Sequence, residues 1–380
     1  MTRRSFSNDE LRTVAKTFSA TGNIIAVECL KSGHINDTYK ITYQNGNSII
    51  DYVLQRINST VFPEPVMIME NIEAVAAHIR SKYESFGWDI NNVLFPLRTL
   101  NNMAFWLDSS GSYWRMYSYI KGGVCYDKAP NAKIMRSIGR AFGMFQMLLS
   151  DFPAKQLNII IPDFHNTKAR FAALEAAAIA AAQCEELKGR YNNASELLFV
   201  LEAHKWVAFS LEEQKEKGIL PLRVTHNDTK CNNVMLDSVT DESLAVIDLD
   251  TVMPGLCAHD FGDSVRAGAN NADEDETDLT KVYLDIDKFT AFAEGFIPAL
   301  EGSLTKPEYE SLALGAPVIA LELAARFLTD YLCGDRYFKV LYPEHNFDRA
   351  KCQLTLALDM LNKLEKLDDI IKGISLCSLN

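Results

Sequence analysis

A short stretch near the middle of the chain carries the residue types that phosphoryl transfer needs. His226, Asp228 and Asn233 lie between two short apolar runs, and Asp248 ends a third apolar run twenty residues after Asp228. This alternation predicts a loop between strands, in which a hairpin could bring the two acids together. One carboxylate beside a hydroxyl acceptor, with an amide and a second carboxylate on a metal ion, is the minimum set for kinase-type phosphoryl transfer.

These residues receive separate predicted roles. Asp228 orients the attacking hydroxyl of the substrate and takes its proton. Asn233 and Asp248 supply the hard oxygen ligands that Mg²⁺ prefers, and Asp250 assists them, either beside the metal or on a second metal ion. His226 is counted with the catalytic residues as a group that orders the loop rather than one that titrates.

One general observation limits this interpretation. Asp and Asn are common in turns because their side chains bond to nearby backbone, so an isolated His-x-Asp pattern carries little weight. Here the five-residue spacing from Asp228 to Asn233, the flanking strands and the Ile-Asp-Leu-Asp ending at Asp250 agree with one another. Lys230 either neutralises the transferring phosphoryl group or simply faces solvent.

The stretch from His226 to Asn233, together with residues 247–250, resembles the aminoglycoside phosphotransferase and choline kinase superfamily. Residues 225–230, 232–234 and 249–255 are closer still to its N-acetylhexosamine 1-kinase group. The resemblance covers the chain from about residue 33 to residue 338. It implies a protein-kinase-like α+β fold, with ATP and Mg²⁺ used to phosphorylate the anomeric hydroxyl of GlcNAc or GalNAc.

Other functions stay open beside this one. Homoserine, choline or an aminoglycoside would serve as acceptor for the same machinery, because fold similarity does not fix the substrate. A non-catalytic nucleotide-binding protein is the alternative from a different class. Retention of Asp228, Asn233 and Asp248 argues against it, since a decayed kinase loses such parts.

Length and composition set the outer bounds. A chain of 380 residues is long for one core and predicts two lobes: a small antiparallel β lobe for nucleotide at residues 1–120 and a mainly helical lobe at residues 121–380. The net charge of −12 argues against nucleic-acid or anionic-membrane partners. The eight cysteines form no C-x-x-C pair, and the first ten residues lack an apolar core, so we expect a cytoplasmic protein with reduced thiols. The oligomeric state is left open.

The first lobe begins with a strand-turn-strand pattern whose turn contains Gly33. Alternating apolar residues predict antiparallel strands at residues 24–30, 38–43 and 48–57. A glycine lets backbone amides approach a phosphate, and Gly33, His34, Asn36 and Thr38 are the predicted nucleotide contacts. His34 is also a candidate acceptor contact. No G-x-G-x-x-G is present, so an ordinary hairpin turn is the alternative.

The phosphate-binding lysine of a kinase is absent from the third strand. Its register falls on Gln55 or Arg56, and we predict Arg56, because a guanidinium bridges phosphate oxygens. Residues 65–82 have the spacing of a helix, on which either Glu70 or Glu73 would pair with Arg56.

Further strands are predicted at residues 93–100, 104–107 and 113–120. The last of them leads into residues 118–123, where a kinase hinge would hold adenine through backbone groups. Tyr119 is the predicted cofactor contact in this hinge.

Acceptor contacts are predicted at several places in the second lobe. Phe164 and His165 combine an aromatic ring with a hydrogen-bonding group, as sugar sites do; the alternative is a loop in which Asn166 or Thr167 caps the helix at 168–183. Asp260 best matches the superfamily's acid that steadies the catalytic loop, whereas Asp263 or Arg266 would bind the sugar. Further helices are predicted at residues 8–20, 132–152, 195–217, 284–300, 307–333 and 347–372, and a solvated, mobile acidic loop at 269–280.

Arg326 is a cation in an otherwise apolar helix. It either forms an ion pair, with Asp330 one turn further on or with another acid, or contacts the acceptor. The sequence leaves both roles open.

Overall fold

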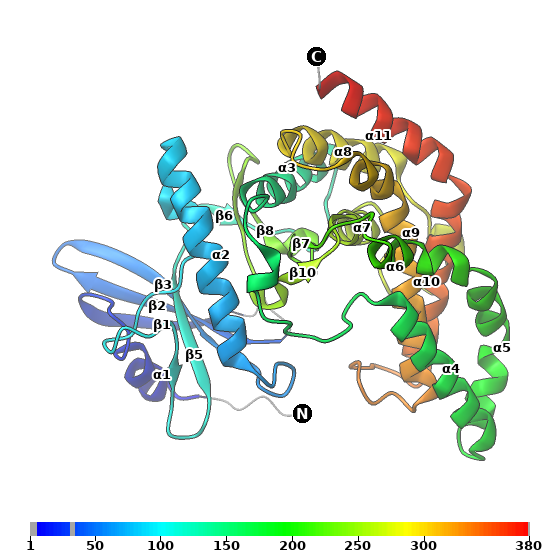
Figure 1. Cartoon of the computed structure of the whole chain (residues 1–380). Helices are drawn as coiled ribbons and strands as arrows, with labels where there is room; N and C mark the ends of the chain where they lie inside the picture. The colour runs from blue at the N-terminus through cyan, green and yellow to red at the C-terminus, as the bar shows by residue number, and fades with distance from the viewer. Residues whose placement is uncertain (1–5, 31–34, 379–380) are drawn as a thin grey trace. The chain divides into compact units, whose positions relative to one another are not determined.

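The computed structural model describes residues 6–30 and 35–378 of the chain. Two compact units can be distinguished, and each is described on its own (Figure 1). Unit 1 holds the residues up to Gly123 together with Lys155–Ile160 and Ile247–Val252; unit 2 holds the rest. The main boundary falls close to residue 120. Two later segments also belong to unit 1, so the units are not two continuous stretches of the sequence.

Within the described part of unit 1, five strands form an antiparallel sheet in the order β1-β2-β3-β5-β4. The strands are β1 Asn23–Leu30, β2 Asp37–Asn45, β3 Ser48–Arg56, β4 Trp106–Leu107 and β5 Tyr113–Ser118. The three predicted N-terminal strands are confirmed. The strand predicted at 93–100 is wrong: Pro96 and Thr99 form only isolated bridges, and a proline has no N–H to donate to a ladder.

One face of this sheet packs against helix α1 (Asn8–Ala15). Tyr39, Ile41 and Tyr43 alternate along β2 and are buried with Leu11 and Ala15 of the helix. Ser7 caps α1 in a capping box with Glu10. The helix ends at Ala15 and not at residue 20, because Phe18 and Ser19 bond to the 98–99 segment instead.

Helix α2 (Pro65–Phe86) runs beside the sheet of unit 1 (Figure 1). It begins at Pro65 and ends at Gly87, which takes the left-handed conformation of a C-cap. Asn71 is buried in this helix and explains why the two later segments join unit 1. Its side-chain nitrogen donates to the carbonyl oxygens of Asn158 (2.9 Å) and Val252 (2.8 Å), and its side-chain oxygen accepts from the Asn158 backbone N–H (2.8 Å).

Unit 2 is built from long helices around two adjoining apolar cores. Its principal helices are α3 Ala132–Leu148, α7 Cys257–Gly268, α8 Ile286–Ala299, α9 Lys306–Leu332, α10 His345–Asn362 and α11 Leu364–Ser378. Helices α7 and α9 approach closely at Gly262 and Gly315, where a Cβ on either residue would overlap the backbone of the other helix. This contact holds α7, which carries Asp260 and Asp263, against α9.

Two predicted helices are each divided. Residues 195–217 form α5 (Lys188–Ala203) and α6 (Lys205–Glu216), separated at His204, whose ring bonds back to the carbonyl oxygen of Val200. Residues 347–372 divide at Lys363, whose ammonium group bonds to Leu284 and Asp359. Helix α4 (Thr167–Gln183) begins where predicted, with Asn166 as its cap.

Helix α9 is long and apolar enough to pass a composition test for a membrane span. However, 78% of its most apolar window is buried inside the fold, where α4, α7 and α10 pack around it. Its apolar surface is therefore used in the core of unit 2.

Short strands frame the segment that carries the candidate site. Strand β7 (Arg223–Thr225) pairs with β10 (Met253–Gly255), and β8 (Val234–Asp237) pairs with β9 (Ser243–Val246). Strand β6 (Gly123–Val124) lies where the chain passes from unit 1 to unit 2. Residues 226–233 thus connect β7 to β8, as the sequence predicted.

Candidate active site

The loop from His226 to Asn233, the catalytic loop below, closes on the carboxylate of Asp228. The amide of Asn233 donates to one carboxylate oxygen of Asp228 (3.1 Å) and to its backbone oxygen (2.8 Å). The ammonium group of Lys230 lies 3.2 Å from the other oxygen, and the charge of Asp228 raises the pKa of Lys230. The five-residue spacing therefore brings an acid, an amide and a cation together in unit 2.

Asp260, at the start of α7, holds the first half of the catalytic loop. Its carboxylate accepts hydrogen bonds from the backbone N–H groups of His226 and Asn227 and from the amide of Gln146, all at 2.8 Å. Burial raises the pKa of Asp260, although these hydrogen bonds act to lower it. This is the steadying role that the sequence predicted for Asp260.

Asp263, one turn further along α7, holds the second half. One oxygen accepts from the Thr229 N–H (2.9 Å), and the other pairs with Arg266 at 2.8 Å. Burial acts to raise the pKa of Asp263, but the charges of Arg266 and Lys230 outweigh it and lower the pKa. The predicted acceptor contact of Asp263 is thus replaced by a structural role, because both of its oxygens face protein groups.

The acidic loop at 269–280 is likewise more tightly held than predicted. Glu274 pairs with the buried Arg266 (3.0 Å), and Asp275 lies 3.0 Å from the ring of the buried His345. Asn270 is also buried. The loop is largely exposed, as expected from composition, but Glu274 and Asp275 tie it to buried residues of the fold.

His226 is fully buried, with its ring against the edges of Phe142 and Phe145. A ring packed in this way orders the loop, in agreement with the role predicted for His226.

Backbone conformation marks two of the site residues. Asn227 and Asp248 have φ angles of 62° and 59°, in the left-handed region. Non-glycine residues adopt it rarely, Asn and Asp more readily than others, and such strain gathers at functional sites. Gly255 lies against Asn227 and Thr225, and a Cβ at Gly255 would overlap both of their side chains.

Asp248 and Asp250 belong to unit 1, whereas Asp228 and Asn233 belong to unit 2. Asp250 is buried with Arg115: the guanidinium group donates to one carboxylate oxygen, and the amide of Asn36 donates to the other at 2.7 Å. Both carboxylate oxygens of Asp250 thus contact protein groups, and its assisting role at the metal stays a prediction. Its charge is balanced by Arg115, which anchors the segment that carries Asp248.

A polar network extends from this anchor through the sheet of unit 1. Gln55 accepts from Arg115 (3.0 Å) and donates to the hydroxyl of Thr38 (3.2 Å). The Asn36 side-chain oxygen accepts from the Asn58 N–H (3.0 Å). The side chains of Asn36 and Thr38, predicted as nucleotide contacts, are thus bonded within the protein.

Gly33 and His34, the other residues predicted for this turn, lie outside the described residues. Their nucleotide and acceptor roles stay predictions.

The structure corrects the predicted partner of Arg56. Arg56 pairs with Asp37 at 2.5 Å, and the two residues face each other directly in the β2–β3 register. A residue directly opposite on the neighbouring strand lies closer to Arg56 than a side chain on a helix outside the sheet does. Glu70 instead accepts from the Asn158 amide (2.9 Å), and Glu73 pairs with Arg98.

Tyr119 follows the end of β5, in the predicted hinge. Its N–H donates to the carbonyl oxygen of Asp51 (3.1 Å), and the Lys40 ammonium group lies over its ring. That N–H is therefore used within the sheet, and a nucleotide contact by Tyr119 would involve its other groups.

Two of the predicted acceptor residues of the second lobe, His165 and Arg326, pair with one carboxylate of α9, Glu322. Arg326 pairs with Glu322 one turn away (3.5 Å) and lies over the ring of Phe164. Nδ1 of His165 lies 3.1 Å from Glu322 and Nε2 lies 3.3 Å from the backbone oxygen of Asn227. Arg326 thus has the predicted ion pair, with Glu322 in place of Asp330, and the acceptor contact predicted for His165 is corrected because both ring nitrogens meet protein groups.

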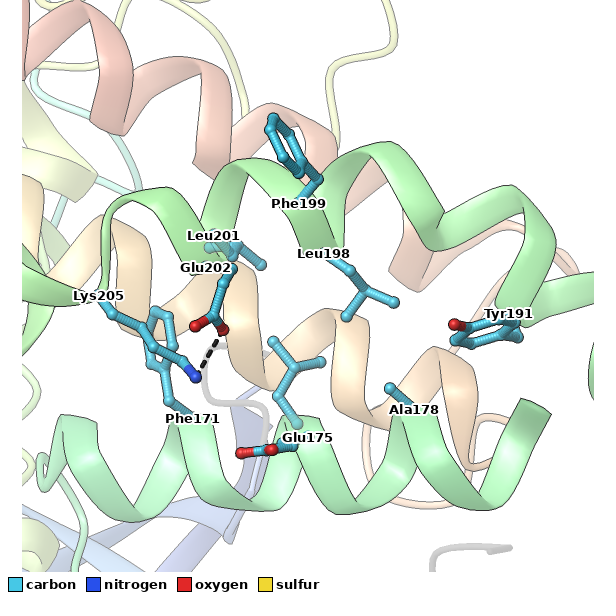
Figure 2. A pocket seen from close by; sticks show the side chains of 10 residues that line it. Phe171, Glu175, Ala178, Tyr191, Leu198, Phe199, Leu201, Glu202 and Lys205 are labelled. Atoms are coloured by element: carbon cyan, nitrogen blue, oxygen red, sulfur yellow. Dashed lines mark ion pairs between the residues drawn. The ribbon is translucent and has the colours of Figure 1, made fainter. Parts of the chain in front are cut away.

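A pocket of about 370 Å³ lies elsewhere in unit 2, between α4 and α5 (Figure 2). Mostly apolar side chains line it, including Phe171 and Leu198, with the Glu202–Lys205 ion pair at one end. None of the ten described side chains that line it is a predicted site residue. Its lining has no group placed for phosphoryl transfer.

The sequence reasoning missed Arg115, Glu322 and Gln146, which hold site residues in place. Arg115 and Glu322 carried a usable signal: each is a charge inside an apolar run, the feature that drew attention to Arg326. Gln146 shows no comparable signal.

We expect Arg115→Met to destabilise the protein by about 3–5 kcal/mol, because it leaves the Asp250 carboxylate buried without its cation. The shift in urea midpoint measures this loss. Arg80→Met is the matched control: Arg80 pairs with Glu84 on the exposed surface of α2, and such pairs contribute about 0–1 kcal/mol. Equal, small losses in the two variants would contradict the anchoring role.

Solved structures share this fold at low sequence identity. An aminoglycoside phosphotransferase from Alicyclobacillus acidocaldarius is 12% identical with a TM-score of 0.62, and the match covers 98% of each chain. A spectinomycin phosphotransferase in complex with ADP and spectinomycin is 11% identical, with a TM-score of 0.58, over 96% of this chain and 100% of that one. A choline kinase from Cryptosporidium parvum is 13% identical, with a TM-score of 0.54, over 97% and 98%. These similarities confirm the predicted protein-kinase-like fold.

The sequence itself matches a defined family over residues 27–294, a span that includes the catalytic loop, Asp248 and the sheet from β2 onward. That span is more than half of the chain. The chain belongs to the phosphotransferase enzyme family, APH.

Proposed function

We propose that the protein is an ATP-dependent kinase that phosphorylates the anomeric hydroxyl of an N-acetylhexosamine, GlcNAc or GalNAc. The observation that carries the kinase chemistry is the arrangement of Asp228, Asn233 and Lys230 on a loop held by Asp260. The acceptor class rests on the resemblance of residues 225–255 to N-acetylhexosamine 1-kinases. The neighbour solved with ADP supports the choice of nucleotide.

In this reaction Asp228 orients the anomeric hydroxyl and accepts its proton. The sugar oxygen then forms a bond to the γ-phosphorus as the bond to the ADP oxygen breaks. Lys230, already beside Asp228, offers positive charge to the transferring group. Asn233 fixes one oxygen of Asp228 and leaves its own amide oxygen for a metal ion.

A bound Mg²⁺ would supply positive charge to the phosphate groups during transfer. The proposed donors fit this ion, because a carboxylate and an amide oxygen are hard oxygen ligands of the kind Mg²⁺ prefers. Mg²⁺ commonly takes one or two carboxylates and fills its shell with water and substrate phosphate. Asp248 and Asn233 are the residues proposed to hold it.

The charges around Phe164 favour an uncharged acceptor over a polycation. The buried carboxylate of Glu322 there faces two cationic groups, Arg326 and the His165 ring. Opposite charges act on the pKa of Glu322 more strongly than burial does and lower it. An aminoglycoside would need uncompensated acids, and this cluster already has its counter-charges.

The proposed acceptor is tested by a panel assay with ATP and Mg²⁺. GlcNAc, GalNAc, glucose, galactose, homoserine, choline and kanamycin are compared by ADP release at equal concentration. We expect the two N-acetylated hexosamines to be turned over best. Turnover of a non-sugar acceptor alone would overturn the sugar assignment while keeping the roles of Asp228 and Asn233.

Asp248→Ala is expected to weaken the dependence of nucleotide binding on Mg²⁺, because it removes a carboxylate ligand of the proposed metal. ATP affinity measured by calorimetry with and without Mg²⁺ checks this. Asp241→Ala removes a surface acid that pairs with Lys133 and serves as the control. If Asp248→Ala leaves ATP affinity and its Mg²⁺ dependence unchanged, the metal role is wrong.

A further inference from the structure

His165 bridges helix α9 and the catalytic loop inside unit 2. Nδ1 of its ring lies 3.1 Å and 3.3 Å from the two carboxylate oxygens of Glu322, and Nε2 lies 3.3 Å from the backbone oxygen of Asn227. Glu322 is 1% exposed. The ring thus joins two groups that are distant in the sequence, one on α9 and one in the catalytic loop.

The chemistry of these two partners determines how many protons the ring carries. An ionised carboxylate and a backbone carbonyl oxygen can only accept hydrogen bonds, so each ring nitrogen must be a donor. Only the imidazolium form of histidine has two N–H groups. Burial acts to lower the pKa of His165, but Glu322 outweighs it and the pKa is raised. Geometry and charge therefore agree on a protonated ring.

The carbonyl that His165 holds is that of the residue directly before Asp228. Asn227 has a left-handed backbone, and its N–H is already fixed by Asp260 at 2.8 Å. A bond to its carbonyl oxygen sets the plane of the Asn227–Asp228 peptide. The direction in which the Asp228 side chain leaves the backbone depends on that plane.

We propose that His165, with protons on both ring nitrogens, is a positioning residue that fixes the Asn227–Asp228 peptide and so directs the carboxylate of Asp228. It does not contact the acceptor through its nitrogens. The proposal rests on the catalytic role assigned to Asp228 above. It makes turnover dependent on a proton that lies outside the reacting groups.

Several charged groups among the described residues act on the ring: Glu322 and Arg326 on α9, and Asp260, Asp263 and the buried His259 on α7. Further out, Arg170 on α4 acts on Glu322, and Lys215 on α6 acts on His259. Burial, followed by the charge of His165, lowers the pKa of His259 to about 3, so His259 stays neutral and does not titrate in the same range. Because the carboxylate of Glu322 is in direct contact, it is the main group that keeps the His165 proton.

The test compares kcat against pH for the full-length wild type, His165→Gln, Glu322→Gln and His204→Gln. GlcNAc is the acceptor, or whichever panel acceptor the wild type phosphorylates. His204, at the end of α5, is the control histidine. A glutamine at position 165 has both of its N–H donors on one nitrogen and an acceptor oxygen beside it, so it cannot replace the two separate ring donors, and it does not titrate in this range.

We expect wild-type kcat to fall as pH rises through the raised pKa of His165. His165→Gln loses this alkaline decline and has a kcat about tenfold to a hundredfold lower, since small misplacements of a catalytic group cost this much, with little change in KM for ATP. Glu322→Gln moves the decline to lower pH, because without the carboxylate the ring loses its proton earlier. His204→Gln retains the wild-type profile.

An unchanged pH profile in folded His165→Gln would overturn the proposal. Nitrogen NMR of the wild type, assigned by comparison with His165→Gln, gives a second test independent of any variant's activity: two protonated ring nitrogens near neutral pH are expected, and one would overturn it. Failure of the proposed function is distinguishable, because Asp228→Asn would then retain turnover. An inactive Asp228→Asn with an unaltered His165→Gln profile would remove only the positioning role.

Discussion

Asp228→Asn is expected to lower kcat by about 10²–10⁴-fold, the usual contribution of a positioned general base. The amide keeps the shape of the side chain and its contact with Asn233, but it cannot accept the proton of the attacking hydroxyl. Because Asp228 is partly exposed, the substitution leaves no buried charge unpaired. Steady-state kinetics at saturating ATP, with a thermal melt to verify folding, measure the effect.

Asp369→Asn is the control for this experiment, since Asp369 is an exposed acid on α11. It should retain wild-type kcat. Near wild-type turnover in Asp228→Asn would show that the carboxylate neither orients the acceptor nor removes its proton.

Asp260→Ala is expected to reduce both stability and turnover. It leaves the N–H groups of His226 and Asn227 without their acceptor, and each buried unpaired donor costs about 1–3 kcal/mol. The amide of Gln146 loses its acceptor as well. The freed loop no longer holds Asp228, so kcat falls even in the fraction that remains folded.

Urea unfolding and kcat measured on the same preparation separate the two effects. Asp260→Asn should lose less stability, because its amide oxygen still accepts from one of the backbone groups. Asp369→Ala controls for removal of an acid. A stable, fully active Asp260→Ala would mean that the catalytic loop holds its conformation without α7.

Local patterns in the sequence predicted the parts of the fold that depend on neighbours in the chain. The alternation along residues 38–43 and 48–57 identified β2 and β3. The capping signal at Asn166 also marked a real helix start. Each of these features is determined within a few residues.

The interactions that position the site are of another kind. Arg115 meets Asp250 across 135 positions, and His165 meets Glu322 across 157. No spacing rule links such partners, because the fold and not the local chain brings them together. The same limit explains why Arg56 was given a helix glutamate in place of Asp37, its neighbour on the adjacent strand.

The roles of the two acids on α7 also depend on tertiary structure. Asp260 and Asp263 are three positions apart in the sequence. The prediction was that Asp260 steadies the catalytic loop and that Asp263 or Arg266 binds the sugar. The structure uses both to bind N–H groups of the catalytic loop. The buried N–H groups of the loop need acceptors, and the helix face that lies against the loop supplies them. The sequence alone does not show which face of α7 this is.

The most direct test of the proposed activity is the position of the new phosphate. Phosphorus NMR of the product made from GlcNAc, ATP and Mg²⁺ should show a resonance coupled to the anomeric proton, and Asp228→Asn should give none of it over the same time. A product resonance without that coupling, or a product only from a non-sugar acceptor, would contradict the assignment of the anomeric hydroxyl as the group that Asp228 activates.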